Sequence, residues 1–479
     1  MASPAKKLEL DESSHSGPPP AHQETVSDKD AVVERYEKLF NNEQFSDIVL
    51  RVGDDRFYAH RFILVTASNV FEAMLGGGDR WKEAQQPEVC LSEDEECLPA
   101  FANFLRYLYC GEVLLTTSGV LPLLLLADKY EIAKLRETCL AYMTRHIVET
   151  ADANRAVTWY LYAQMTGQTA FRDQCLSFIL SNFDIVMKAV DWADLSLQEL
   201  TGFLACSEMV VHSEAALWSY VEKWLLSENN KEDIESNLKE VLPLIRFTMM
   251  PPKSLLQVEN SSLYRDHQQR FSGKLNHAYR RHSLVMDGGD ETTSTSDSPR
   301  EAYRNYYCEE YCLSHAFSLN GYADISKIES RITLDCSTRQ RFVAPSRAKS
   351  EDLTLFSVYF FPRGYFTTLT IYGSYMGRQN NDVTLKVIRR RPDLLPMKVD
   401  VTLVLFGRQN GVKYAAFTHS CSMVFTKDNH TLSVEKFLDI NSLMKENSPY
   451  LVDGNMEGTI FLKIQDVGNH LVKLEQGQE

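Results

Sequence analysis

The spacing of apolar residues changes along this sequence, and the change limits the folds that it can adopt. Across residues 154–258, apolar residues such as Trp159 and Ala163 recur at positions three and four apart, which predicts amphipathic helices. Beyond Pro299 the spacing becomes two, in runs such as DVTLKVI and KVDVTLVLFG, which predicts antiparallel strands. Together with a length of 479 residues, the two patterns indicate several domains.

Proline and glycine positions mark the expected boundaries and turns. Pro251–Pro252 is expected to stop the helical region, because proline lacks the amide that a continuing helix needs. The polar segment Asp287–Pro299 contains almost no apolar residue and is predicted to be a flexible linker. Asn410–Gly411 lies between two alternating runs and predicts a type I′ hairpin turn.

Residues 45–143 combine the spacing of strands with the spacing of helices. Residues 45–64 are predicted to form a strand, a turn at Gly53–Asp55, a second strand and the start of a helix. Helical spacing continues to Leu75, breaks at Gly76–Gly78, and resumes at 99–109 and 120–143. This part is expected to be an α/β unit.

Composition excludes several classes of partner. The net charge of -15 and the pI near 5.4 disfavour nucleic acid and anionic membranes as partners. The longest apolar stretch, Val120–Ala127, is far shorter than the roughly 20 residues that cross a bilayer. Ten scattered cysteines favour reduced thiols, hence a cytoplasmic or nuclear location.

The first 24 residues lack the apolar core of a signal peptide and are expected to be a disordered tail of an intracellular chain. A secreted form would instead require glycosylation at the sequons of Asn260 or Asn429.

The familiar catalytic motifs are absent from the sequence. It contains no Walker A loop, GxGxxG turn, GxSxG elbow or HExxH helix, so no enzymatic activity and no cofactor are expected. Cys308, Cys312, His315 and Cys336 offer four zinc ligands, but their spacing is not a standard zinc pattern. Buried thiols are the preferred interpretation, and no metal site is predicted.

Several segments of the N-terminal part carry a family resemblance. Phe45–Leu50, Phe57–Arg61 and Leu64–Phe71 resemble the start of a BTB/POZ domain. Phe104–Glu112 and Leu126–Tyr130 look like later helices of that domain.

The rest of the chain resembles two further families. Ser213–Trp224 is similar to the signature helix of a BACK domain, and Leu244–Phe247 is similar to its next helix. Residues 437–438, 450–454 and 459–467 resemble a TRAF/MATH-type β-sandwich. The predicted fold is therefore multidomain, with an α/β BTB/POZ domain at 29–148, an all-α BACK domain at 149–262, a linker at 263–302, an antiparallel TRAF/MATH-like β-sandwich at 303–470, and tails at 1–28 and 471–479.

The BTB/POZ resemblance implies a homodimer whose interface buries the first helix. The apolar residues at helical spacing before the first strand would supply that face, and the alternative is a helix that covers its own monomer. Asp47 and His60 match positions that recur in the family as a buried polar pair near this interface, and the alternative, which is compatible with it, is a satisfied pair in the core. The predicted interface residues are Val32, Val33, Tyr36, Leu39, Phe40, Asp47 and His60.

The resemblance also implies a role as a cullin-3 adaptor. Trp81-Lys82-Glu83 fits a hydrophobic-x-Glu pattern in the loop after the helix that ends at Leu75, with Trp81 as a hot spot and Glu83 as a hydrogen-bonding acid. The alternative is that Trp81 packs on its own domain. The helices within Val157–Val186 would extend the cullin-binding surface.

The expected function is a non-enzymatic dimeric adaptor, the substrate-recognition subunit of a cullin-3 RING ubiquitin ligase. Its TRAF-like domain would hold a protein partner that the sequence does not identify. The alternative function is a BTB-mediated scaffold or regulatory protein that acts without a cullin, and co-purification with cullin-3 separates the two.

Overall fold

The computed structural model describes residues 27–76, 86–286, 304–307, 313–320, 330–335, 355–363, 382–389, 397–439, 442, 445 and 448–466. Its contacts divide the chain into two compact units. The first comprises residues up to Leu115 and Pro122–Glu137, and the second comprises Thr116–Leu121 and the residues from Thr138 onward.

The first unit combines a small sheet with helices. The three-stranded sheet has the order β2-β1-β3, with β1 antiparallel to β2 and parallel to β3. Gly53, with φ of +58°, turns the chain between the first two strands, as predicted. The elements are α1 (Lys29–Glu37), β1 (Ile48–Val52), β2 (Asp55–Ala59), α2 (Arg61–Ala67), α3 (Asn69–Leu75), β3 (Glu88–Leu91), α4 (Leu98–Cys110), α5 (Val120–Lys129) and α6 (Ala133–Arg145), which spans the division between the units.

Aromatic rings form the centre of the first unit's core. Phe71 of α3 stacks on Tyr130, with ring centroids 4.5 Å apart, and the buried Phe104 packs on the same tyrosine. Ser68 breaks the helix between α2 and α3, because its hydroxyl accepts the amide of Phe71 as an N-cap. The same hydroxyl donates to the carbonyl oxygen of Tyr130 at 2.6 Å. The cap and the core are therefore joined at one residue.

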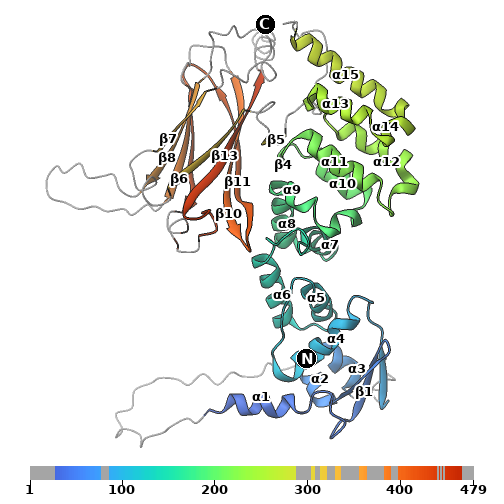
Figure 1. The fold of residues 1–479 in the computed structure, drawn as a ribbon. Coiled ribbons are helices and arrows are strands. Elements are labelled where there is room, and N and C mark those ends of the chain that lie inside the picture. Colours follow the sequence, from blue (N-terminus) through green and yellow to red (C-terminus); the bar gives the residue numbers. More distant parts are fainter. Residues whose placement is uncertain are drawn as a thin grey trace, which may run out of the picture. The chain divides into compact units, whose positions relative to one another are not determined.

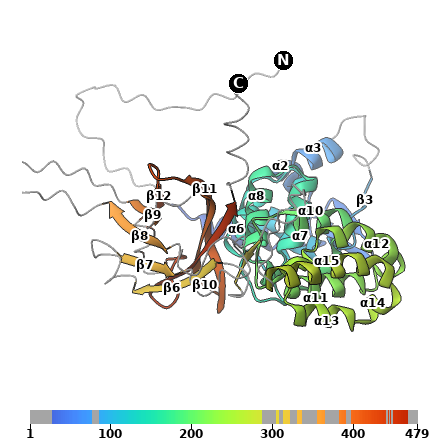
Figure 2. The ribbon, with the colours of Figure 1, turned by 90° about the horizontal axis from the view of Figure 1, so that it is seen from above.

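The N-terminal part of the second unit is helical, and its helices α10 to α15 lie together in both views (Figures 1 and 2). Ser196 and Glu199 form a capping box at the start of α10, and Ser213 caps α11. The elements are α7 (Ala156–Met165), α8 (Thr169–Ser181), α9 (Phe183–Val186), η2 (Val190–Asp194), α10 (Leu197–Ala205), β4 (Val210–Val211), α11 (Glu214–Leu225), η3 (Lys231–Asp233), α12 (Ile234–Val241), η4 (Leu242–Leu244), η5 (Phe247–Met249), α13 (Pro252–Glu259), α14 (Ser262–Asp266), α15 (Gln268–Met286) and β5 (Asn305–Tyr306).

The helical region extends beyond its predicted end. Residues 263–286, which were expected to belong to the linker, form most of α14 and all of α15. Phe271, Leu275 and Ala278 of α15 are buried at helical spacing, and His282 bonds through Nε2 to the carbonyl oxygen of Met250 at 2.8 Å. The predicted linker therefore starts too early. Its polar part, 287–299, lies outside the described residues.

Two further local predictions need correction. Pro252 does not stop the helical region but occupies the first position of α13, where a proline costs no hydrogen bond. The segment Leu244–Phe247 was expected to be helical, but Ile245 and Arg246 connect the 3-10 turns η4 and η5.

The C-terminal part of the second unit is an antiparallel β-sandwich, as predicted (Figure 1). Its sheets have the orders β11-β10-β13-β6 and β12-β9-β8-β7. Buried residues of both sheets, such as Val401 of β10 and Leu385 of β9, form one core. The strands are β6 (Leu313–Asn320), β7 (Ser330–Asp335), β8 (Leu355–Arg363), β9 (Asp382–Arg389), β10 (Met397–Gln409), β11 (Val412–Phe425), β12 (Thr431–Asp439) and β13 (Asn455–Asp466).

The hairpin at Asn410–Gly411 is confirmed. The two residues join β10 to β11 and have φ of +51° and +76°, the positive values that a type I′ turn requires.

Candidate dimerisation surface

Helix α1 carries apolar side chains that one chain leaves exposed. Asp28 caps the helix by accepting the amide of Ala31 at 3.4 Å. Val32 and Tyr36 lie one turn apart on the same face and are 42% and 39% exposed. Val33 is half-buried. The helix therefore presents an apolar strip that a second protein surface can cover.

The C-terminal end of α1 is attached to α4. Glu37 forms an ion pair with Arg106, and the ring of Phe40 lies 5.9 Å from that of Tyr109. Leu39 and Phe40 are half-buried. These contacts fix the end of α1 on its own unit, so the interface and covering-helix interpretations are compatible.

Asp47 and His60 make their hydrogen bonds to different partners in the single chain. Asp47 is exposed, and its Oδ1 accepts the amide of Arg61 at 2.8 Å. It thereby caps α2, whose N-cap position is occupied by His60 without a side-chain cap. The buried pairing expected for the two residues is thus not formed within one chain.

The imidazole of His60 is buried against Tyr109. The hydroxyl of Tyr109 accepts the amide of His60 at 3.0 Å and lies 3.0 Å from Nδ1. Burial raises the pKa of Tyr109 to about 12, so the hydroxyl keeps its proton and can donate it to Nδ1. In the tautomer whose Nδ1 accepts this hydrogen bond, Nε2 carries the ring proton.

His60 Nε2 is buried and has no hydrogen-bond partner within the part of the chain that the structure describes. A buried donor without an acceptor costs about 1–3 kcal/mol. An acceptor supplied by a second chain would remove this cost, which favours the interface interpretation of His60.

Two exposed aromatic residues of the same unit were not predicted. Phe45, with φ of +67°, is 77% exposed, and Phe62 of α2 is 69% exposed. The sequence does hold a signal for Phe62. Phe62, Ile63 and Leu64 are three consecutive apolar residues, and three consecutive residues of a helix cannot all face one side.

The predicted cullin-binding residues Trp81 and Glu83 lie outside the described residues. The preceding helix α3 ends at Leu75, as predicted, with Gly76 as its C-cap. Cys308, Cys312 and Cys336 also lie outside the described residues.

Within the described ranges, no cluster of three or more His, Cys, Asp and Glu side chains is arranged to hold a metal ion. The helices of this same part of the chain include none that is both long and apolar enough to cross a bilayer.

Three family models match consecutive parts of the chain. The BTB/POZ domain model matches residues 36–147, and the model named BTB And C-terminal Kelch, or BACK, matches 156–260. The model of the BTBD17 TRAF domain matches residues 301–472. In order, the three matches correspond to the α/β region, the helical region and the β-sandwich.

Curated relatives match about half of the chain. BTB/POZ domain-containing protein 17 of Homo sapiens is 33% identical over 244 residues, which cover 50% of this chain and 48% of that protein. Its Xenopus laevis counterpart is 30% identical over 238 residues, 48% of each chain. Galectin-3-binding protein of Mus musculus is 28% identical over 257 residues, 52% of this chain and 42% of the relative.

The chain thus spans about half the length of the curated relatives that it matches. The order of its three domains agrees with the order of the folded regions in the structure. The chain is a BTB/POZ–BACK protein with a C-terminal TRAF-like domain, similar to BTB/POZ domain-containing protein 17.

Proposed function

We propose that this chain is a non-enzymatic dimeric adaptor, the substrate-recognition subunit of a cullin-3 RING ubiquitin ligase. The observation that carries the proposal is the presence of a BTB/POZ–BACK pair and a separate β-sandwich in one chain. Such a chain can dock on a ligase with one part and hold a partner with the other. A location in the cytoplasm or nucleus belongs to the same proposal.

Dimerisation would use the surface of α1. Two observations support this assignment: Val32 and Tyr36 are exposed, and Nε2 of His60 has no partner among the described residues. Complete burial of a large apolar side chain contributes about 1.5–3 kcal/mol, so a second copy would gain from covering both residues. The same contact would supply an acceptor for the buried imidazole.

Cullin-3 binding would use the loop after α3. Trp81 would insert its ring into an apolar pocket, and Glu83 would accept a charge-assisted hydrogen bond. Helices α7 to α9 would extend the contact. The acidic net charge of the chain gives no support to nucleic acid as the partner, and we propose that the β-sandwich holds a protein.

Calorimetric titration of the full chain with the purified N-terminal region of cullin-3 tests the proposal. The double change Trp81→Ala with Glu83→Ala should weaken binding by at least about thirtyfold, equivalent to roughly 2 kcal/mol. Lys82→Ala is the matched control, because Lys82 occupies the middle position of the motif, where any residue is allowed.

The outcomes of this titration are distinct. If the unchanged chain does not bind cullin-3, the adaptor proposal fails and a scaffold function replaces it. If the double variant still binds, docking uses another surface. A large fall in the melting temperature of the double variant would place Trp81 in the core.

A further inference from the structure

Residues 304–307 lie between the helical region and the β-sandwich of the second unit. Their short strand β5 pairs in parallel with β4 of the helical region. The amide of Asn305 donates to the carbonyl oxygen of Met209 at 3.1 Å, and that of Tyr307 donates to Val211 at 3.0 Å. Residues 304–307, which are close to the β domain in sequence, therefore form a two-stranded sheet with the helical region.

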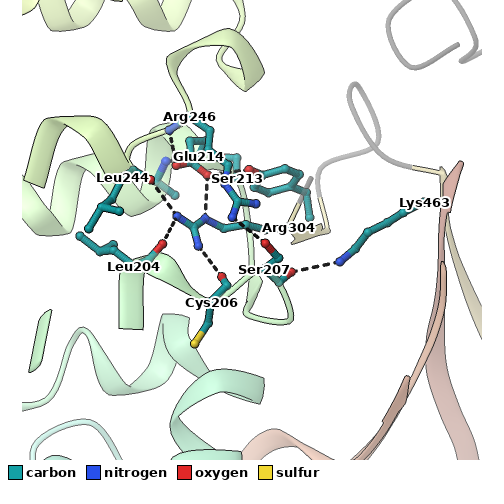
Figure 3. Close-up of polar contacts among 11 residues, drawn as sticks. Leu204, Cys206, Ser207, Ser213, Glu214, Leu244, Arg246, Arg304 and Lys463 are labelled. Atoms are coloured by element: carbon teal, nitrogen blue, oxygen red, sulfur yellow. Dashed lines mark hydrogen bonds and ion pairs between the residues drawn. The ribbon is translucent and has the colours of Figure 1, made fainter. Parts of the chain in front are cut away.

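Arg304 is fully buried, and each nitrogen of its guanidinium has a partner (Figure 3). Nη1 donates to the carbonyl oxygen of Cys206 at 2.6 Å, and Nη2 donates to those of Leu204 at 2.7 Å and Leu244 at 3.1 Å. Leu204 and Cys206 lie at the C-terminal end of α10, where carbonyl groups lack helical partners and a positive charge is favourable. Arg304 therefore caps α10 from a distant part of the sequence.

Glu214 provides the negative charge of this network. It lies in the first turn of α11, is 1% exposed, and forms an ion pair with Arg304 Nε at 3.2 Å. Its Oε2 also accepts the hydroxyl of Tyr306 at 2.6 Å, while its Oε1 accepts the amide of Arg246 at 2.8 Å. A buried carboxylate needs such partners. Two of the three come from residues 304–307, so the helical region is incomplete without this segment.

The next residue, Tyr307, contacts the β-sandwich. Its ring lies 6.1 Å from that of Phe406 in β10 and 5.4 Å from that of Phe461 in β13. Phe461 alternates with the sandwich-core residues Ile460 and Leu462, so it lies on the opposite face of its sheet. Residues 304–307 therefore bind the helices with one end and the outer face of the sandwich with the other.

A second contact crosses the same junction. Lys463 Nζ of β13 donates to the carbonyl oxygen of Ser207 at 3.0 Å (Figure 3). The hydroxyl of Ser207 in turn accepts Nη2 of Arg246 at 2.9 Å, and the amide of Arg246 donates to Glu214. The polar network around Arg304 thus continues to the sandwich.

We propose that residues 304–307 are a latch that fixes the TRAF-like sandwich on the BACK helices, with Arg304 and Tyr306 as its anchors. The BACK and TRAF-like domains then act as one rigid body, and a partner held by the sandwich keeps a fixed orientation relative to the BACK domain. This assignment does not depend on cullin-3 binding.

The test uses the full chain with a site-specific protease sequence inserted between residues 290 and 298. After complete cleavage, the two fragments of the otherwise unchanged chain should elute together in size-exclusion chromatography. With Arg304→Met they should separate. Arg408→Met is the matched control, because Arg408 is a sandwich arginine whose ion pair with Asp453 is exposed, and its fragments should stay together.

Hydrogen–deuterium exchange on the uncut chain gives a second measurement. Exchange of the Asn305 and Tyr307 amides should become about a hundredfold faster in Arg304→Met and about tenfold faster in Tyr306→Phe, which removes one hydrogen bond. The latch is refuted if the parent fragments separate, or if these amides exchange at the parent rate in Arg304→Met. Should Arg304→Met fail to fold, unchanged exchange in Tyr306→Phe refutes it.

Discussion

Replacement of Asn182 by alanine should strongly destabilise the second unit. Asn182 follows α8 and is 5% exposed. Its Oδ1 accepts the amide of Ala415 at 2.6 Å, and its Nδ2 donates to the carbonyl oxygens of Ala415 and Phe178, each at 3.2 Å. Ala415 belongs to β11, an edge strand of its sheet. The asparagine amide therefore takes the place of a neighbouring strand at that residue.

The expected cost follows from the groups left without partners. Asn182→Ala leaves the buried amide and carbonyl of Ala415 unsatisfied, and each such group costs about 1–3 kcal/mol. We expect a loss of about 3 kcal/mol of unfolding free energy. Ser181→Ala is the control. The hydroxyl of Thr418 donates a part-buried hydrogen bond to that of Ser181 at 2.9 Å, and loss of this bond should cost about 1 kcal/mol or less.

The unfolding free energy of both variants is measured by urea denaturation, with the fluorescence of the second unit's buried tryptophans as the signal. The reasoning is refuted if the unfolding free energies of Asn182→Ala and Ser181→Ala differ by less than about 0.5 kcal/mol, which is the size of effect expected of surface substitutions.

Three further predictions concern separate residues. Tyr36→Asp should convert the proposed dimer to a monomer, because it places a charge in the proposed apolar interface. Light scattering that still shows a dimer on dilution would contradict this. Burial lowers the pKa of His282, so near pH 6 the unfolded chain binds a proton that the folded chain does not. Stability should therefore fall as the pH drops below about 6.5. The fall should be smaller in His282→Gln than in the parent or in His430→Gln, the control at an exposed histidine. Melting temperatures that depend on pH equally in all three proteins would be inconsistent with this role. Gly407→Ala should lower the unfolding free energy by about 1–3 kcal/mol, because the new Cβ would overlap a neighbouring backbone carbonyl oxygen. In Gly202→Ala, the control, the new Cβ has no atom within 4 Å, so thermal unfolding should show a neutral or stabilising effect.

Local patterns predicted the elements whose conformation is decided by adjacent residues. Asn410–Gly411 indicated the β10–β11 turn because few other pairs tolerate two positive φ angles. The strand predicted at the start of residues 45–64 is likewise present as β1, whose alternating residues Ile48, Leu50 and Val52 are buried.

Position in the sequence alone could not reveal the role of Arg304. Its partners lie 60 to 100 residues earlier in the chain, and a single arginine beside a polar segment has no distinguishing pattern. The end of the helical region was missed for a related reason. Helix α15 buries only a narrow face, at Phe271, Leu275 and Ala278, among many polar residues.

The apolar residues of the candidate dimer surface were found because Val32 and Tyr36 repeat at helical spacing. That Nε2 of His60 lacks a partner in the described part of the chain could not be foreseen, since this depends on how the imidazole packs against Tyr109 of a distant helix.

The most direct test of the adaptor proposal is the mass of the complex formed between the full chain and the N-terminal region of cullin-3, measured by light scattering. Alone, the chain should form a dimer of about 110 kDa, twice its 54.8 kDa. With excess cullin-3 the mass should rise by two cullin fragments, one for each BTB/POZ domain. A dimer whose mass does not change would contradict the ligase role, and a monomer would contradict the dimer interface as well.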